Sequence, residues 1–191
     1  DESEKNRTLT IKTSVTDLVP RSIAGTLPQL SLLQALDLPV YGNATLEMTS
    51  DGDIRTASLS IDVGHGSLQL PALPEAPLEV DGGSVELAYD GAAEKVTLAP
   101  STLSWRGSRV TISGTATEEK ADAENSSWTF SLRSDSGSFA AEEFKVPAVA
   151  LDEWRASGRI VPRRGQIELP EFILRARGAE IALSGDPLTG L

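Results

Sequence analysis

Short runs in which apolar and polar residues alternate dominate this sequence and constrain its fold more than any other feature. In the clearest run, residues 56–63, Ala57, Leu59, Ile61 and Val63 fall on one face, and hydroxyl or acidic residues fall on the other. A period of two is typical of a strand with one buried face and one face in water. About a dozen such runs, separated by Gly, Asp and Pro, predict a mainly β chain of antiparallel strands joined as a meander.

An internal repeat indicates how the strands are arranged. Residues 95–114 align without gaps with residues 166–185, and the two copies share an Arg-Gly turn and a terminal Ser-Gly. Repetition of a strand-turn-strand unit predicts an elongated antiparallel sheet that grows by adding such units. We therefore expect residues 1–191 to form a single β-rich segment of a larger repetitive protein.

One segment departs from the alternation. Residues 27–36 place Leu30, Leu33 and Leu36 at helical spacing, after an early proline of the kind that helix starts tolerate. This spacing predicts a short amphipathic helix, which we expect to cover one open end of the apolar sheet face. The polar stretch 134–137 predicts a flexible loop.

The composition excludes several kinds of chemistry. With 28 acidic and 17 basic residues the chain has a net charge of -11, which opposes binding to nucleic acid. It has no Cys and a single His, His65, so disulfides, thiolate catalysis and Cys/His zinc sites are excluded. No Gly-x-Ser-x-Gly motif accompanies His65, which we expect at the surface, and Asp51 and Asp53 lack the spacing of a calcium loop. We predict that the chain is not an enzyme and uses no cofactor or metal.

The apolar face of the predicted sheet is the remaining candidate for function. In a closed sandwich its aliphatic side chains fill the core, whereas in an open, curved sheet they line a channel and acyl chains supply the burial. Alternation is compatible with both arrangements. The residues that would contact lipid in the open sheet are Leu46, Met48, Leu59, Ile61, Val63, Leu68, Leu70, Val85, Leu87, Val110 and Ile112.

Several stretches together resemble the AsmA-like family, and within it the large YhdP-type members. These stretches are LDLPVYGNATLEM at residues 36–48, DGDI at 51–54, ASLSI at 57–61 and GHGSLQLP at 64–71, followed by the repeated Arg-Gly and Ser-Gly units. The resemblance covers roughly residues 25–191. Its specificity lies in the order and combination of these pieces.

The resemblance implies a periplasmic protein of Gram-negative bacteria in which a long β-sheet groove, a β-taco, carries phospholipids between the inner and outer membranes. It implies phospholipid acyl chains as the ligand, other envelope proteins as further partners, and no catalytic residues. Members of the family are anchored in the inner membrane by an N-terminal helix. Membrane attachment is therefore expected only through parts of the parent chain outside this segment.

Two other functions fit the same pattern. An outer-membrane protein assembly factor would pair its exposed strand edges with client strands. A structural β-sandwich domain of a secreted repetitive protein would bury the same aliphatic face inside itself. Peptide capture without lipid binding would indicate the first, and a fully closed apolar face would indicate the second.

Overall fold

Strands make up most of the chain in this computed structural model, which describes residues 8–24, 33–69, 77–120, 126–141, 146–161, 166–177, 179–183 and 188–189. The main sheet contains β1 (Thr8–Leu18), β3 (Val40–Thr49), β4 (Ile54–Val63), β7 (Gly82–Asp90), β8 (Lys95–Trp105), β9 (Ser108–Lys120), β10 (Ser126–Ala141), β11 (Val146–Leu151), β12 (Glu153–Val161), β13 (Gln166–Ala176), β14 (Ala179–Leu183) and β15 (Leu188–Thr189). A small sheet contains β2 (Leu36–Asp37), β5 (Gly66–Leu68) and β6 (Leu78–Val80), and a short 3-10 helix, η1 (Pro20–Ser22), follows β1.

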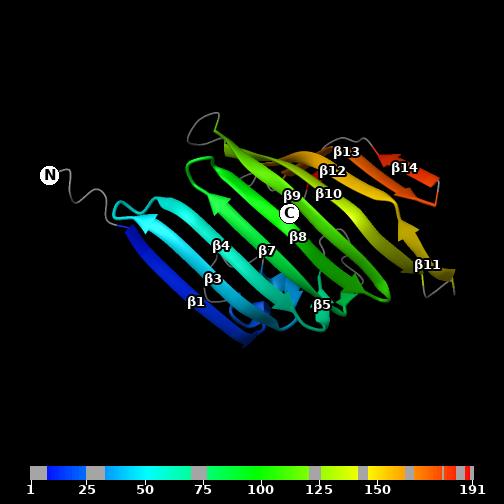
Figure 1. The fold of residues 1–191 in the computed structure, drawn as a ribbon, viewed down its shortest axis with the longest axis horizontal. Coiled ribbons are helices and arrows are strands. Elements are labelled where there is room, and N and C mark those ends of the chain that lie inside the picture. The colour runs from blue at the N-terminus through cyan, green and yellow to red at the C-terminus, as the bar shows by residue number, and fades with distance from the viewer. Residues whose placement is uncertain are drawn as a thin grey trace.

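The main sheet is an open meander of twelve strands. Its hydrogen-bonded order is β1-β3-β4-β7-β8-β9-β10-β12-β13-β14, with β11 paired to β10 and β15 paired to β13. The described strand pairs are all antiparallel. Figure 1 shows the sheet extending from β1 at one edge to β14 at the other without closing on itself. The predicted mainly β, antiparallel meander is confirmed.

The two copies of the internal repeat form equivalent hairpins. Residues 95–114 form β8 and the start of β9, and the described part of 166–185 forms β13 and β14. Arg106 and Arg177 both have positive φ at the turn, 42° and 48°. Positive φ lets a two-residue turn follow the right-handed twist of its strands. The Arg-Gly turn predicted at Arg106 is confirmed, since β8 and β9 pair directly on either side of it.

The small sheet covers one end of the main sheet's apolar face. Its contacts bury a cluster that lies between the two sheets. The cluster consists of Leu38, Val40 and Val80, and the partly buried apolar residues packed against it are Val15, Leu18, Val63, Leu68 and Leu103. These contacts involve strand ends on one side of the main sheet, so the rest of the face is left without a second layer in the described part of the chain.

Two local predictions are corrected by the structure. The helix predicted for residues 27–36 is not formed where the chain is described: residues 33–35 make a 3-10 turn, and Leu36 begins β2 and pairs with Leu68. Leu30 lies outside the described residues. Pairing with β5 gives Leu36 both a backbone partner and an apolar neighbour, and this tertiary contact outweighs helical spacing. Strand β2 belongs to the small sheet, which covers one end of the apolar face.

The loop predicted at residues 134–137 is a β-bulge inside β10. The register of β10 against β9 shifts between Arg133 and Ser136, and Ser134 is buried with its hydroxyl donating to the Ser136 carbonyl at 2.9 Å. The bulge changes the partner of β10, because residues 128–134 pair with β12 and residues 137–141 pair with β11. Polar residues that resemble a loop in sequence here bend a long strand.

Candidate functional site

The strand registers place apolar residues of neighbouring strands side by side in rows that cross the main sheet. From β1 to β8 one row is Ile11, Leu46, Ala57, Tyr89 and Val96, and the next is Thr13, Ala44, Leu59, Leu87 and Leu98. Registered partners in antiparallel strands share a face of the sheet. The rows therefore form one continuous apolar surface, which we call the apolar face.

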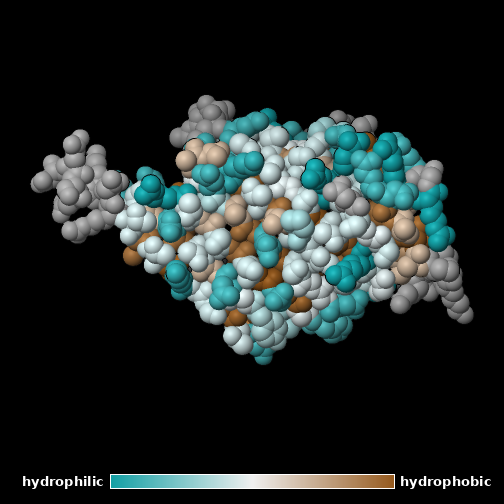
Figure 2. Space-filling model, in the orientation of Figure 1, coloured by the Kyte–Doolittle hydropathy of each residue, from teal (hydrophilic) through white to brown (hydrophobic). Residues whose placement is uncertain are grey.

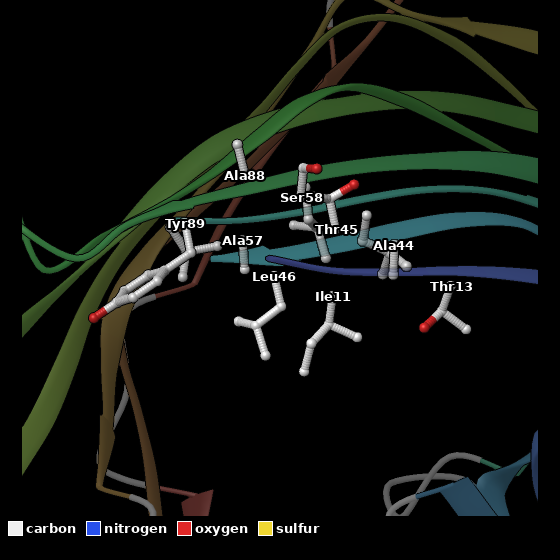
Figure 3. Close-up of a pocket in the computed structure, with 12 residues that line it drawn as sticks. Ile11, Thr13, Ala44, Thr45, Leu46, Ala57, Ser58, Ala88 and Tyr89 are labelled. Carbon is white, nitrogen blue, oxygen red and sulfur yellow. The ribbon is translucent and has the colours of Figure 1, made fainter. Parts of the chain in front are cut away.

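These rows line an open hollow of about 470 Å³, the aliphatic hollow, whose lining is almost entirely carbon. In Figure 3, Ile11, Leu46 and Tyr89 point to one side of the sheet, whereas Ala88 points to the other. Three of the residues predicted to contact lipid line this hollow: Leu46, Leu59 and Leu87.

Aromatic side chains of strands that are not neighbours meet on the apolar face. Tyr89 in β7 and Trp128 in β10 are three strands apart in the sheet, a distance of about 14 Å at the usual strand spacing,. Their ring centroids are nevertheless 6.5 Å apart. Trp105 and Phe139, two strands apart, have ring centroids 5.6 Å apart in an edge-to-face arrangement. The large rings extend over the strands between them, so aromatic side chains are packed together on this face.

A second, smaller hollow of about 240 Å³ lies on the same face farther along the sheet. Its lining is apolar and includes three aromatic rings. The lining residues are Leu78, Leu103, Trp105, Val110, Ile112, Phe139 and Trp154. Val110 and Ile112 were predicted to contact lipid, whereas the aromatic residues were not. The alternation of Trp128, Phe130 and Leu132 in the sequence indicates aromatic side chains on one face of β10, but none of these three residues lines this hollow.

The remaining residues that were predicted to contact lipid or to form the helix lie elsewhere in the fold. Met48 pairs with Leu9 near the end of β3, and Ile61 pairs with Val85, so these lie on the apolar face beyond the hollows. Val63 and Leu68 pack against the buried cluster beneath the small sheet. Leu70 lies outside the described residues, Leu33 is in the 3-10 turn and Leu36 is in β2.

The aliphatic hollow is open toward the β1 edge of the sheet. Leu9 and Ile11 in β1 are 54% and 44% exposed, and Ile54 in β4 is 44% exposed. Leu9 and Ile11 lie at register positions on the apolar face, opposite Met48 and Leu46. Large aliphatic side chains are thus exposed to water at the margin of the apolar face.

The opposite, outer face of the sheet is rich in hydroxyl groups. One row across it contains Thr45, Ser58, Ala88, Thr97, Thr115, Ser131 and Ser157. Figure 2 views the main sheet from this side, and its surface is mostly pale and teal, with brown only in patches between polar residues. The two faces therefore differ sharply in polarity, as the alternating sequence predicts.

Two polar groups have shifted pKa values, and neither lines a hollow. The Tyr41 hydroxyl donates to the Asp17 carboxylate at 2.9 Å, and this bond, more than burial or charge, raises the pKa of Tyr41. Arg175 donates to Glu180 at 2.9 Å and also to Glu153, and these contacts raise the pKa of its guanidinium group. Both are surface contacts that stabilise local geometry, and such exposed pairs contribute little to stability.

The residues singled out in the sequence for catalysis or metal binding lie apart from the hollows. His65 is exposed in the turn between β4 and β5, as expected. Among the described residues, no three His, Asp or Glu side chains come close enough together to hold a metal ion. The helical segments in that part of the chain are too short or too polar to cross a bilayer. What the geometry provides is an extended apolar surface.

Comparison of the chain with protein-family models, with curated proteins and with solved structures found no match.

Proposed function

We propose that this chain is a periplasmic segment of an AsmA-like protein whose apolar face holds phospholipid acyl chains during transport between the inner and outer membranes. The observation that supports this most is the aliphatic hollow: about 470 Å³, open, and lined almost entirely by carbon. An exposed apolar surface of this kind is typical of a binding site for apolar ligands.

The physical basis is the burial of methylene groups. Each methylene that leaves water for an apolar surface contributes about 0.8 kcal/mol. The hollow presents aliphatic side chains without converging polar groups, so it constrains the position of a flexible chain very little. We infer that acyl chains slide along the face, whereas a receptor for one rigid ligand would hold it with a few directed hydrogen bonds.

The path of the lipid would cross the strands. Ten strands follow one another in the main sheet, and nine spacings of about 4.8 Å give a path of about 43 Å,. The aliphatic hollow lies toward the β1 end of this path and the aromatic-lined hollow lies farther along it. The phospholipid head groups would remain in water beside the apolar face. The proposed transport includes no enzymatic step. Attachment to the inner membrane would be through other parts of the parent chain.

The structural sandwich is a weaker alternative. A sandwich requires a second sheet over the whole apolar face. In the described part of the chain the second sheet has three short strands, and they contact the main sheet around Val40, Val63 and Leu103 at one end. The assembly-factor alternative depends on strand edges, and the exposed β1 edge is the feature that would serve it.

Native mass spectrometry tests the proposal. The protein is exposed to vesicles of bacterial phospholipid, separated from them without detergent, and weighed intact. We expect a population carrying one or more phospholipid molecules, released by a non-denaturing detergent that competes for the hollow. Recovery of the protein only in its lipid-free mass would contradict the proposal.

A further inference from the structure

Tyr89 is the one side chain of the aliphatic hollow that joins a large ring to a hydroxyl group. Its ring lines the hollow in register with Ala57 and Val96, and it packs against Trp128 with ring centroids 6.5 Å apart. Figure 3 shows the hydroxyl at the far end of the ring, on the side of the hollow away from Thr13. The side chain therefore presents carbon to the hollow and a hydrogen-bond donor to its margin.

The two tyrosines of the chain differ in what their hydroxyl groups contact. The Tyr41 hydroxyl donates to Asp17 at 2.9 Å. Within the described part of the chain the Tyr89 hydroxyl has no hydrogen-bond partner, and water reaches it in the empty protein because Tyr89 is half-buried in an open hollow. An acyl chain that covers the hollow displaces this water and supplies only carbon and hydrogen. Because a hydroxyl that loses water without gaining an acceptor costs free energy, the ligand must bring an acceptor to this point.

Tyr89 lies near the end of β7 that the small sheet leaves uncovered. At the other end of β7, Gly83 pairs with Val63, which packs against the buried cluster beneath the small sheet. Tyr89 is six positions after Gly83, a distance of about 20 Å along an extended strand. Val85 and Leu87 are the positions between them on the apolar face. One strand thus has a covered apolar end and an uncovered end that carries a donor.

An acyl chain of ordinary length fits along this part of β7. The hydrocarbon core of a bilayer is about 30 Å thick, so the chains of one leaflet span about 15 Å. A chain whose ester lies at Tyr89 therefore ends near the small sheet. The opposite orientation would place the ester beside the aliphatic cluster of Leu38, Val40 and Val80. Tyr and Trp side chains lie at the boundary between acyl chains and head groups in bilayers, and Tyr89 with Trp128 forms a similar pair at the uncovered end.

Thr13 offers the other hydroxyl group on the apolar face of the hollow. It lies in β1, three strands from Tyr89, so the two hydroxyl groups are about 14 Å apart across the sheet and one ester cannot contact both. Thr13 is exposed, so water still reaches it when an acyl chain lies along β7. The need for an acceptor in the ligand is therefore greater at Tyr89.

We propose that the Tyr89 hydroxyl donates a hydrogen bond to an ester carbonyl of the bound phospholipid, and that the acyl chain runs from there along β7 toward the small sheet. This inference rests on the proposed function, since it names the group by which the hollow recognises the lipid. One hydrogen bond orients the lipid and sets the depth of its chains, but it is too weak to hold the lipid against movement across the strands.

Competition between ester-linked and ether-linked lipids tests the contact. Vesicles contain equal amounts of phosphatidylethanolamine with two ester-linked saturated chains and of its counterpart with ether-linked chains of the same length. Native mass spectrometry measures the ratio in which the protein carries the two lipids. Because the ether lipid lacks the carbonyl, the ester-to-ether ratio should be roughly threefold to tenfold higher in the wild type than in Tyr89→Phe. Tyr41→Phe, which removes the same atom outside the hollow, should keep the wild-type ratio.

Three results overturn the contact while leaving lipid binding in place. Equal ratios in the wild type and Tyr89→Phe would show that the hydroxyl does not bind the ester. Equal loss of both lipids in Tyr89→Phe would assign the hydroxyl to the phosphate, which the two lipids share. A ratio lowered by Thr13→Val and not by Tyr89→Phe would place the ester at the β1 side. Failure of the wild type to bind either lipid would contradict the proposed function, and this contact with it.

Photo-crosslinking tests the orientation of the chain independently. Phospholipid that carries a diazirine either next to the ester or at the methyl end of the same chain is bound to the wild type and irradiated, and the labelled residues are identified by peptide mass spectrometry. The label next to the ester should react around Tyr89 and Val96, and the label at the methyl end should react around Val63 and Val85. The reverse distribution, or the same distribution for both labels, would overturn the orientation.

Discussion

Replacing Leu59 with aspartate places a carboxylate in the centre of the aliphatic hollow. Leu59 is half-buried, pairs with Ala44 and Leu87, and lines the hollow. Full burial of a leucine contributes about 1.5–3 kcal/mol, so losing this half-buried side chain should lower the free energy of unfolding by roughly 1–2 kcal/mol. The carboxylate can stay hydrated in the empty protein because the hollow is open.

The effect on lipid binding should be larger than the effect on stability. An acyl chain that covers Leu59→Asp must remove water from a charge, and with the lost aliphatic contact this should weaken binding by about 2–4 kcal/mol, or roughly thirtyfold to several hundredfold. The assay is titration with a phospholipid that carries a fluorescent acyl chain, with circular dichroism melting to confirm folding. Ser58→Asp is the matched control, because Ser58 immediately precedes Leu59 and, although it also borders the hollow, its side chain points to the outer face (Figure 3). Equal affinities for the wild type and a folded Leu59→Asp protein would refute the assignment, as would equal losses in both variants.

Three further predictions concern other parts of the sheet. Gly42 has φ of 151°, and a Cβ at this position would lie 2.1 Å from the Ser60 carbonyl oxygen. Gly42→Ala should therefore lower the free energy of unfolding, measured in urea, by about 2 kcal/mol or more. A loss below about 0.5 kcal/mol would contradict this close approach. The hydrogen bond to Asp17 raises the pKa of Tyr41 above its ordinary value near 10. This bond therefore stabilises the folded protein below pH 10, and its contribution is lost as the pH rises through the pKa of Tyr41 in the folded protein. Asp17→Asn should move the Tyr41 pKa back toward 10 in a tyrosinate absorbance titration, and no change would show that the bond is not formed in solution. Bound phospholipid that carries bromine on its acyl chains should quench tryptophan fluorescence, because Trp105 lies on the apolar face. Quenching only by phospholipid that carries bromine on its head group would contradict that placement.

The alternating runs were sufficient to predict the strands whose inward residues are large and aliphatic. Strand β4 (Ile54–Val63) matches the run at 56–63 because Leu59 and Ile61 give it a clear period. Strand β12 (Glu153–Val161) was missed, since Ala156 and Gly158 occupy two of its inward positions. A large partner explains their small size: a Cβ on Gly158 would lie 2.8 Å from the Phe130 ring.

The candidate site was predicted in part, because the face on which a side chain lies is set locally, whereas contacts between separated strands are not. Sequence alternation alone places Leu59 and Leu87 on one face. The meeting of Tyr89 with Trp128 depends on the order and register of four strands, which no short stretch of sequence encodes. The small sheet was also missed, because β2, β5 and β6 are too short to show a period and form only through mutual contact around Val80.

Site-specific photo-crosslinking tests most directly whether the apolar face carries acyl chains. A photoreactive amino acid is placed at Leu87, whose side chain lies on the apolar face, or at the adjacent Ala88, which also borders the hollow but whose side chain points to the outer face. Each variant of the full parent protein is irradiated in bacterial cells, and the adducts are identified by mass spectrometry. We expect phospholipid adducts at Leu87 and few or none at Ala88. Equal labelling at the two positions, or no lipid adduct at Leu87 in a folded protein, would contradict the account.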